Sequence, residues 1–292
     1  MNTCQNILIT GASSILMQDM IEKIDKKKFK IWAVTRDKSK IKNSEIEILE
    51  GDICTPIFIN NIIREKKIDI VIHAAAVTHT FNTQDYFDVN LQSTMHLVNA
   101  SKNNNVSKFI FISSRAASKQ SGAYGFSKLK AEEFIKTNFV NYLIIRPPEV
   151  FGGNKNEGID KLIQDVFHKK VILCPVNLKS KLYPIYNSDA IQIIFNLIFN
   201  TPLDNKLVTF SGKEGFSYYE LICKIRKAIN KKIFIIPVPK FIMFAIKWIV
   251  EIFRIKMGFV PDQVPRLYSH KEKGLQYNSI TIEEYVIGQK RF

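Results

Sequence analysis

Cysteine is scarce in this sequence, and its four cysteines are widely scattered. Cys4, Cys54, Cys174 and Cys223 form no CxxC pair and no Cys/His cluster. This spacing argues against a disulfide scaffold and against a metal site, and it predicts reduced thiols. Glycine and proline are also few, at 12 and 10 of 292 residues, while 46% of the residues are hydrophobic. These proportions exclude collagen-like, low-complexity and largely disordered chains.

Long apolar runs are missing too. No window of 18 residues is both apolar and free of charge, so we expect no membrane-spanning helix. The N-terminal segment 1–13 lacks the charged and apolar regions of a secretion signal. We therefore expect the chain in the cytoplasm or at the inner face of a membrane.

Acidic residues are outnumbered. The chain carries 42 Lys and Arg against 27 Asp and Glu, which gives a formal net charge of +15. Such a charge favours anionic partners, from phosphorylated small molecules to nucleic acid and acidic lipid. The lysines are spread along the whole chain, however, as on an ordinary solvated surface, and no RNP, zinc-finger or basic-zipper pattern is present. We expect no nucleic-acid partner.

The first half of the chain alternates short apolar runs with amphipathic segments. Strands are expected at 6–10, 30–34, 45–50, 68–73, 108–112 and 142–146, and helices at 15–24 and 86–101. Strands that alternate with helices indicate a parallel sheet with right-handed crossovers. Several strands are apolar on both faces, which indicates helices on both sides. The predicted fold class is α/β, with a Rossmann-type doubly wound parallel sheet.

After Phe151 the pattern changes. A loop is expected at 151–158, helices at 159–168, 187–200 and 218–229, and extended pieces at 183–186 and 206–211. We predict a dinucleotide-binding domain over 1–150, to which the segment 187–211 returns. A smaller substrate-binding α/β domain then comprises 151–186 and 212–292.

The turn after the first strand is a candidate phosphate site. A glycine-rich turn that opens a helix lets backbone N–H groups face a pyrophosphate. Gly11 is present, but Ser14 or Ile15, and Met17, stand where a full fingerprint has further glycines. Ser14 can donate its hydroxyl to phosphate, whereas Met17 is expected to push the helix away from the strand. We assign Gly11, Ser13, Ser14 and Ile15 to cofactor binding.

The end of the second strand bears on the choice of cofactor. An acidic residue there binds the adenosine ribose hydroxyls, whereas an arginine accommodates a 2′-phosphate. Arg36 stands at this position with Lys38 and Lys40 nearby, which favours NADP(H). Asp37 keeps NAD(H) as the alternative.

The strongest local signal is a serine, tyrosine and lysine set. Ser114 ends the FIFISS run, and Tyr124 and Lys128 follow at YxxxK spacing. On a helix, Tyr124 and Lys128 lie one turn apart on the same face. A lysine ammonium beside a phenol favours the phenolate, which lets Tyr124 exchange a proton with a sugar oxygen near neutral pH. We predict that all three are catalytic, with Ser114 bonded to the same oxygen and Lys128 also holding the nicotinamide ribose.

Together these motifs resemble the extended short-chain dehydrogenases/reductases, in the branch of NAD(P)-dependent nucleotide-sugar epimerases, dehydratases and 4-ketoreductases. The resemblance runs nearly end to end. The matching segments are TGAS at 10–13, GDI at 51–53, HAAA at 73–76, Asn90, Ser114, Tyr124 with Lys128, RPPEVFG at 146–152, PIYNSDA at 184–190 and 267–286.

The resemblance implies cofactor contacts for residues that follow the strands. Those that would flank the adenine or line the dinucleotide are Asp52, Ile53, Ala74, Ala75 and Ala76. His73 would be a loop residue beside the cofactor and not a metal ligand. Asn90 would support the active-site water and backbone, and Pro147 and Val150 would approach the nicotinamide and the substrate.

Three departures from the family pattern bear on function. The reduced glycine turn argues against tight permanent cofactor binding. The short interval between Ser114 and Tyr124 leaves out a loop that covers substrate in relatives. Arg115 and Ala116 replace the Asp-Glu pair that dehydratases of this family use as acid and base, so we do not expect a 4,6-dehydratase.

The function expected from the resemblance is NAD(P)H-dependent reduction, at C4, of a nucleotide-activated 4-keto-6-deoxy sugar for cell-surface polysaccharide synthesis. The alternative is a 4-epimerase acting on a nucleotide-linked or polyprenyl-diphosphate-linked sugar, which returns the hydride to the opposite face. A non-catalytic dinucleotide sensor is a more distant alternative. We expect a homodimer.

Residues 240–254 form an amphipathic segment. Lys240, Lys247, Glu251 and Arg254 fall on one helical stripe, and the remaining positions are apolar and mostly large. Such a helix fits the core of the second domain or a dimer contact. It also fits a peripheral position in a membrane interface, helped by the positive net charge.

Overall fold

The chain divides into two compact units. The computed structural model describes residues 4–41, 43, 45–153, 157–202, 205–255 and 259–289. Unit 1 comprises Met1–Lys119, Ala123–Arg146 and Ile191–Val208, and unit 2 comprises Gln120–Gly122, Pro147–Ala190 and Thr209–Phe292. The first boundary thus falls after Arg146 where the sequence suggested 150, and the returning segment is shorter than the 187–211 expected.

Unit 1 is built on a doubly wound sheet that continues into β10 and β12, whose residues from Thr209 on belong to unit 2. The strand order of the sheet is β12-β10-β6-β5-β4-β1-β2-β3. The strands are β1 (Gln5–Thr10), β2 (Phe29–Thr35), β3 (Glu47–Glu50), β4 (Ile70–His73), β5 (Lys108–Ile112), β6 (Tyr142–Arg146), β10 (Lys206–Gly212) and β12 (Leu275–Tyr277). β1 pairs in parallel with both β2 and β4, so the strand order reverses beside it. This confirms the predicted fold class.

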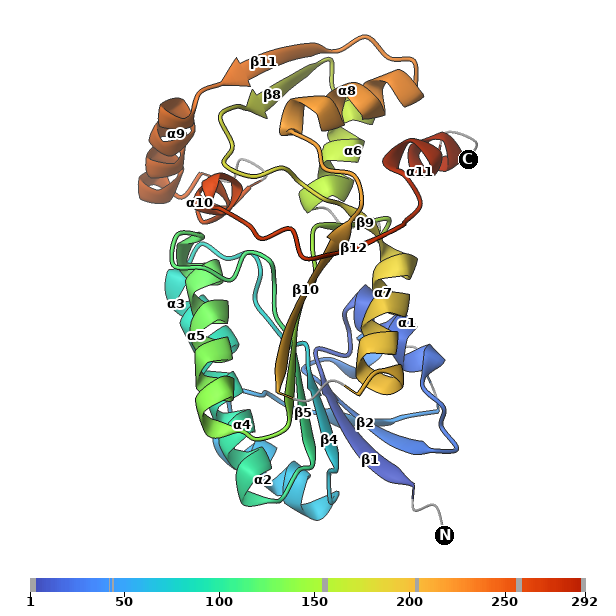
Figure 1. Cartoon of the computed structure of the whole chain (residues 1–292). Helices are drawn as coiled ribbons and strands as arrows, with labels where there is room; N and C mark the ends of the chain where they lie inside the picture. The colour runs from blue at the N-terminus through green and yellow to red at the C-terminus, as the bar shows by residue number, and fades with distance from the viewer. Residues whose placement is uncertain are drawn as a thin grey trace. The chain divides into compact units, whose positions relative to one another are not determined.

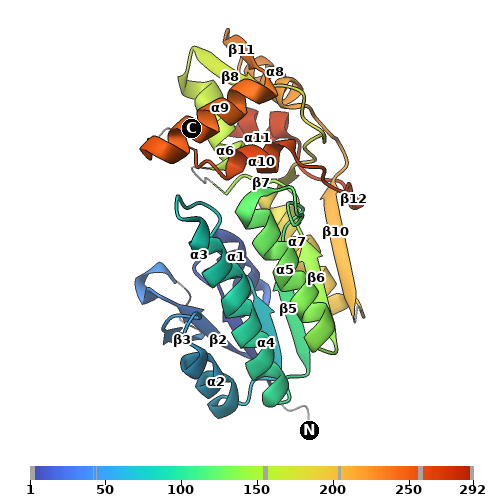
Figure 2. The ribbon, with the colours of Figure 1, turned by 90° about the vertical axis from the view of Figure 1, so that its left-hand side faces the viewer.

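Helices cover both faces of this sheet. α2 (Pro56–Glu65), α4 (Ser93–Asn103) and α5 (Gly122–Asn138) lie on one face, and α1 (Ile15–Lys23) and α7 (Asn187–Phe195) lie on the other (Figures 1 and 2). The helix expected at 86–101 is divided into α3 (Thr83–Phe87), a π-helical turn at Asp88–Gln92, and α4. A second π-helical turn, Asn196–Asn200, follows α7. A 3-10 turn, Lys38–Lys40, follows β2.

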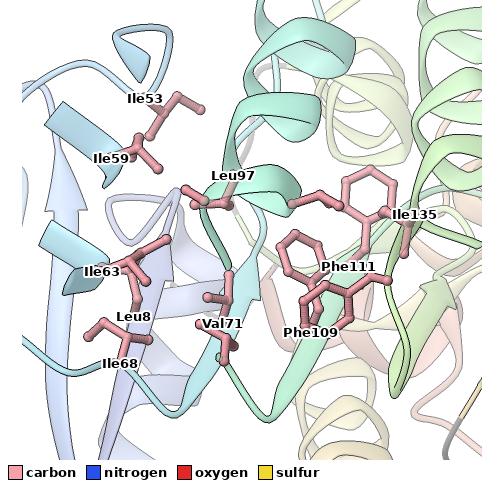
Figure 3. Close-up of a cluster of buried hydrophobic side chains, with 14 of the residues drawn as sticks. Leu8, Ile53, Ile59, Ile63, Ile68, Val71, Leu97, Phe109, Phe111 and Ile135 are labelled. Atoms are coloured by element: carbon pink, nitrogen blue, oxygen red, sulfur yellow. The ribbon is translucent and has the colours of Figure 1, made fainter. Parts of the chain in front are cut away.

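The core on the α5 side of the sheet joins the elements that carry the catalytic candidates. Phe109 and Phe111 of β5 project toward Ile135 of α5, and Val71 of β4 lies beside Leu97 of α4 (Figure 3). These five side chains are at most 1% exposed. Burying each contributes roughly 1.5–3 kcal/mol. The packing therefore holds α5 firmly against β5.

Unit 2 has its own core. It lies among α6 (Gly158–His168), α8 (Tyr218–Ala228), α11 (Ile282–Gln289) and the parallel pair β8 (Val171–Pro175) and β11 (Phe234–Val238). The other elements are β7 (Val150–Phe151), β9 (Ile185–Tyr186), α9 (Lys240–Phe253) and α10 (Gln263–Tyr268). The sequence missed β7, β8 and β11, because these strands are short or isolated from the main sheet. Residues 154–156 of the expected loop lie outside the described residues.

Candidate active site

The predicted site residues of unit 1 follow strands that end at a common edge. Thr10 is in register with Val34 and His73, and His73 is in register with Phe111. Carboxyl ends of parallel strands share one edge of the sheet, and ligands of open α/β sheets bind at that edge, where the order reverses. The β1 turn, Arg36, Asp52, the segment 74–76 and Ser114 all follow strands at this edge.

Gly11 allows two loops of this edge to approach each other. Its φ is +70°, and a Cβ placed on it would lie 2.6 Å from the backbone nitrogen of Ala75. Any side chain would therefore collide with backbone as well as strain the turn. Glycine is needed here for contact between the loops after β1 and β4, which brings Ala74–Ala76 beside the candidate phosphate turn.

Ser14 begins α1 as its N-cap. Its Oγ accepts a hydrogen bond from the backbone N–H of Met17 at 3.3 Å. The first-turn N–H groups of Ile15 and Leu16 have no acceptor within the helix, so with the helix dipole they suit an anion. Ser13 lies half-buried before the cap, and Met17 is fully buried. The turn fits a dinucleotide pyrophosphate despite its single glycine, and the bond from Ser14 to phosphate stays a prediction.

The carboxylate of Asp37 is engaged locally, whereas Arg36 is exposed. Asp37 accepts hydrogen bonds from the hydroxyl and the backbone N–H of Ser39, at 2.6 and 3.0 Å, and these bonds lower the pKa of Asp37. Asp52 is also exposed, and its carboxylate accepts from Cys54 N at 2.9 Å. Ile53 is 9% exposed and belongs to the core shown in Figure 3.

The three catalytic candidates lie in the turn that follows β5 and on α5. Ser114 is half-buried, and its Oγ accepts a hydrogen bond from Ala116 N at 3.1 Å. Tyr124 and Lys128 are one turn apart on α5, as predicted, and are 9% and 1% exposed. Tyr86 of α3 packs edge-on against the Tyr124 ring, with centroids 6.1 Å apart.

Lys128 is held by backbone and by an aromatic ring. Its Nζ donates a hydrogen bond to the carbonyl of Ile112 at 2.8 Å and lies 3.9 Å from the ring centroid of Phe111. Burial lowers the pKa of Lys128 to about 7, and the negative charge of Glu132 acts against that fall. The charge of this lysine therefore depends on its neighbours, which suits a group that must respond to a phenolate.

Glu132, one helical turn after Lys128, forms an ion pair with Arg146. The sequence analysis did not identify this pair. Both carboxylate oxygens of Glu132 accept from Arg146, with N–O distances of 2.8 and 2.6 Å. The hydroxyl of Ser113 donates to the same carboxylate at 2.5 Å, and Glu132 is fully buried. Only the spacing in the sequence could have pointed to Glu132, because it follows Lys128 by one helical turn and so lies on the same face of α5.

His73 is not the loop residue that the resemblance implied. It is the last residue of β4 and is fully buried. Its Nδ1 lies 2.6 Å from Oγ1 of Thr10, and its Nε2 lies 2.8 Å from Oγ1 of Thr94. Thr94 donates to the carbonyl of Asn90, so the ring donates from Nε2 and accepts at Nδ1. Burial lowers the pKa of His73 to about 3, which keeps the ring neutral.

The Thr10–His73 pair also supports the segment 74–76. Thr10 Oγ1 accepts from the backbone N–H of Ala75 at 3.3 Å. Asn90 is completely buried and hydrogen-bonds the backbone of Val77, the next residue of the same loop. Its amide donates to Val77 O at 3.0 Å and accepts from Val77 N at 2.8 Å. Asn90 therefore holds backbone, as expected.

The remaining predicted residues divide between the two units. Arg115 and Ala116 are buried in unit 1, at 4% and 9% exposed. Pro147 and Val150 follow β6 and belong to unit 2, and their roles stay predictions.

Within the described ranges no three His, Cys, Asp or Glu side chains are grouped to hold a metal ion. Over the same ranges, no helix has the length and apolar character needed to span a membrane.

Comparison with known proteins agrees with this architecture. Residues 7–198 match the model of the NAD dependent epimerase/dehydratase family. The chain belongs to that family, which also agrees with the predicted NAD(P)-dependent class of oxidoreductases.

Two curated relatives differ in the reaction that they are named for. The chain is 25% identical over 230 residues to dTDP-D-glucose 4,6-dehydratase of Bos taurus, covering 66% of this chain and 64% of that protein. It is 25% identical over 172 residues to N-acetyl-alpha-D-glucosaminyl-diphospho-ditrans,octacis-undecaprenol 4-epimerase of Escherichia coli O157:H7, covering 52% and 51%. The chain thus spans between half and two thirds of the length of these relatives.

Two solved structures share the fold over nearly the whole chain. UDP-glucose 4-epimerase of Thermotoga maritima with UDP-glucose matches with a TM-score of 0.70 and 15% identity, covering 97% of this chain and 96% of that one. dTDP-4-dehydrorhamnose reductase of Bacillus anthracis in complex with NADP matches with a TM-score of 0.67 and 19% identity, covering 99% of both. At such identities the likeness establishes the fold.

Proposed function

We propose that the protein reduces a nucleotide-activated 4-keto sugar, of the 4-keto-6-deoxy type, at C4 with NAD(P)H, in cell-surface polysaccharide synthesis. The observation that supports this proposal is the set Ser114, Tyr124 and Lys128, since Ser114 follows β5 and the other two residues lie one turn apart on α5. The buried Arg115 and Ala116 stand where a dehydratase has its acid and base. A reductase needs only the proton that Tyr124 can give.

Each residue of the set has one task in this reaction. The hydride for the carbonyl carbon would come from a bound nicotinamide. Tyr124 protonates the carbonyl oxygen, and Ser114 orients that oxygen by a hydrogen bond. Lys128, fixed by Ile112 O, offsets the negative charge left on the phenolate. The buried Glu132 keeps Lys128 protonated to a higher pH.

NADPH is the preferred reductant in this proposal. Arg36 is exposed beyond the end of β2, where a 2′-phosphate would lie. Asp37, the residue that could bind ribose hydroxyls in NAD, is instead bonded to Ser39. The reductase that shares the fold over 99% of both chains is in complex with NADP.

The test is a stopped assay with a 4-keto-6-deoxy nucleotide sugar and either reduced cofactor. We expect loss of absorbance at 340 nm, stoichiometric with a reduced sugar identified by NMR. Arg36→Ala should raise KM for NADPH by roughly 10- to 150-fold with little change for NADH, because a charged hydrogen bond contributes about 1.5–3 kcal/mol. No turnover of any 4-keto sugar with either cofactor would contradict the proposal.

A 4-epimerase is the second candidate. It uses the same three residues, and the undecaprenol-linked epimerase among the relatives favours it. Native mass spectrometry of protein purified without added cofactor separates the two. A dinucleotide bound at one per chain indicates an epimerase that recycles its cofactor, and an empty protein indicates the reductase. A protein that binds dinucleotide but converts neither substrate is the sensor. The homodimer stays a prediction.

A further inference from the structure

Helix α9 of unit 2 is exposed on its apolar side. Of its 14 residues, only Val250 is buried. The large apolar side chains that remain exposed are Phe241 (74%), Trp248 (62%), Phe253 (69%), Ile252 (52%), Ile249 (42%), Ile242 (39%) and Phe244 (37%). This excludes the core helix that the sequence allowed at 240–254.

The apolar exposure covers one continuous arc of the helix. The side chains turned toward the unit are Met243, Ile246 and Val250, spaced three and four residues apart. Lys240, Lys247 and Glu251 form a narrow charged stripe beside that contact. At about 100° per residue, the exposed apolar positions fill roughly half of the circumference. A helix of a water-exposed surface has polar residues on that outward half.

The strand pair β8–β11 lies next to α9 (Figures 1 and 2) and also carries exposed apolar side chains. In the parallel pair β8–β11, Val171 is in register with Phe234, and Leu173 is in register with Ile236. These four side chains lie on the outer face and are 46%, 69%, 53% and 38% exposed, respectively. Only Pro239 separates the end of β11 from α9. We call α9 and this outer face together the apolar platform.

The apolar platform is bordered by positive charge. Lys169 and Lys170 precede β8, and Lys231 and Lys232 come just before β11. Because the two strands run in parallel, both pairs lie at the same edge. Lys169 also pairs with Asp165 at 2.9 Å, and Lys231 donates to Phe167 O at 2.5 Å, so the exposed Lys170 and Lys232 contribute most to the positive charge of this edge. Between residues 224 and 256 the single acidic residue is Glu251, and its carboxylate pairs with Lys247 at 2.6 Å.

We propose that the apolar platform docks on the surface of an anionic lipid bilayer, independently of which sugar reaction the protein performs. The exposed arc of α9 would lie in the boundary between headgroups and acyl chains, and the bordering lysines would meet anionic headgroups. A second copy is disfavoured as the occupant, because each copy carries a net charge of +15, which opposes contact between two such surfaces.

The test is flotation of the full chain with vesicles of phosphatidylcholine, with and without 30% phosphatidylglycerol (about one lipid in three). We expect flotation with the anionic vesicles at low salt and a weaker effect at about 0.5 M salt, because surface charges are then screened. In a Trp32→Phe background, Trp248 fluorescence should shift to shorter wavelength on binding. The double variant Phe241→Glu/Trp248→Glu should reduce the partition coefficient by roughly tenfold or more.

Ile57→Glu/Val140→Glu is the matched control, since these residues are also exposed, at 74% and 81%, but lie in unit 1. It should float as the wild type does. Both double variants should keep their affinity for NADPH, which separates this test from that of the reaction. Equal flotation of the two double variants, or none of the wild type, would overturn the proposal. So would a wild-type dimer that Phe241→Glu/Trp248→Glu converts to monomers in light scattering, because the occupant would then be a second copy.

Discussion

Helices α5 and α9 both break the rule that charged side chains are exposed and apolar side chains are buried, but each breaks a different half of it. α5 buries charged residues, with Lys128 and Glu132 at 1% and 0% exposed. α9 exposes large apolar residues, with Phe241 and Trp248 at 74% and 62%. The buried charges of α5 are satisfied within unit 1, by Ile112 O and by Arg146. The charges of α5 thus have their partners within the chain, whereas the apolar arc of α9 is left exposed by it.

The energetic reason differs between the two helices. An unpaired charge inside a protein costs several kcal/mol, so Lys128 and Glu132 are kept only with partners. Exposed apolar surface costs about 25 cal/mol per Å² relative to burial, a penalty that a folded chain tolerates until a partner removes it. Changes in α5 should therefore affect folding and chemistry, and changes on the outward arc of α9 should affect neither in solution.

Loss of the Tyr124 hydroxyl should change turnover more than any other substitution considered below. Tyr124→Phe should reduce kcat by about 10²–10⁴-fold, because it removes the proton donor while the ring still packs against Tyr86. Affinity for NADPH, measured by fluorescence titration, should change little. Tyr142→Phe, on β6, is the control and should keep wild-type kcat. A Tyr124→Phe enzyme that retains more than about a tenth of kcat would remove the tyrosine from the mechanism.

Glu132→Gln should lower the free energy of unfolding by about 3–5 kcal/mol, since it leaves Arg146 without its buried counter-charge. The adjacent Glu133 is exposed and pairs with Lys130 at 2.8 Å, so Glu133→Gln should change stability by less than about 0.5 kcal/mol. Urea unfolding followed by circular dichroism measures both. Similar losses in the free energy of unfolding for the two variants would show that the burial of Glu132 does not make its ion pair more important for stability than an exposed one.

His73 should make stability depend on pH on the acid side. Its folded pKa is about 3, below the usual 6.5, so between these values the unfolded chain binds a proton that the folded chain does not. The free energy of unfolding should therefore fall as pH drops below 6.5, by at most about 1.4 kcal/mol per pH unit from this group.

His73→Asn should flatten the difference between urea unfolding at pH 7 and at pH 4.5. His79→Asn, at an exposed position, should leave that difference as in the wild type. An unchanged pH dependence in His73→Asn would show that the ring is already protonated in the folded state.

The smallest expected effect lies within α9. Val250→Ala should destabilise the protein by about 1–2 kcal/mol, because its side chain is fully buried. Trp248→Ala should change the free energy of unfolding by less than about 0.5 kcal/mol without vesicles, despite removing a much larger side chain. A larger loss for Trp248→Ala in thermal unfolding would mean that the outward arc already packs on the chain.

The sequence predicted the strands of unit 1 well because their signal is local. Runs such as 108–112 and 142–146 are apolar and short, and the observed β5 and β6 have those bounds. β8 and β11 were missed, since their identity as strands depends on pairing with each other across some sixty residues. The interruption of the helix at 86–101 was missed as well, because a π-helical turn carries no simple composition signal.

Within the site, spacing alone brought Tyr124 and Lys128 together, because a helical turn is a local rule. Glu132 follows the same spacing rule, but its role depends on a hydrogen bond from Arg146 of β6. No local sequence pattern predicts that contact. The apolar pattern at 68–73 correctly placed His73 at the end of a strand, whereas the resemblance implied a loop residue. Neither showed that Thr10 and Thr94 hydrogen-bond its ring from other elements.

The α/β class and the position of Tyr124 and Lys128 on one helical face follow from periodicity and chain order. Which charges are buried and which apolar side chains stay exposed depends on how distant elements pack. An amphipathic pattern at 240–254 is compatible with a core and with a surface, since periodicity shows that one face differs from the other but not what lies against it. Only the packing of α9, through Met243, Ile246 and Val250, shows that its broad apolar face is turned outward.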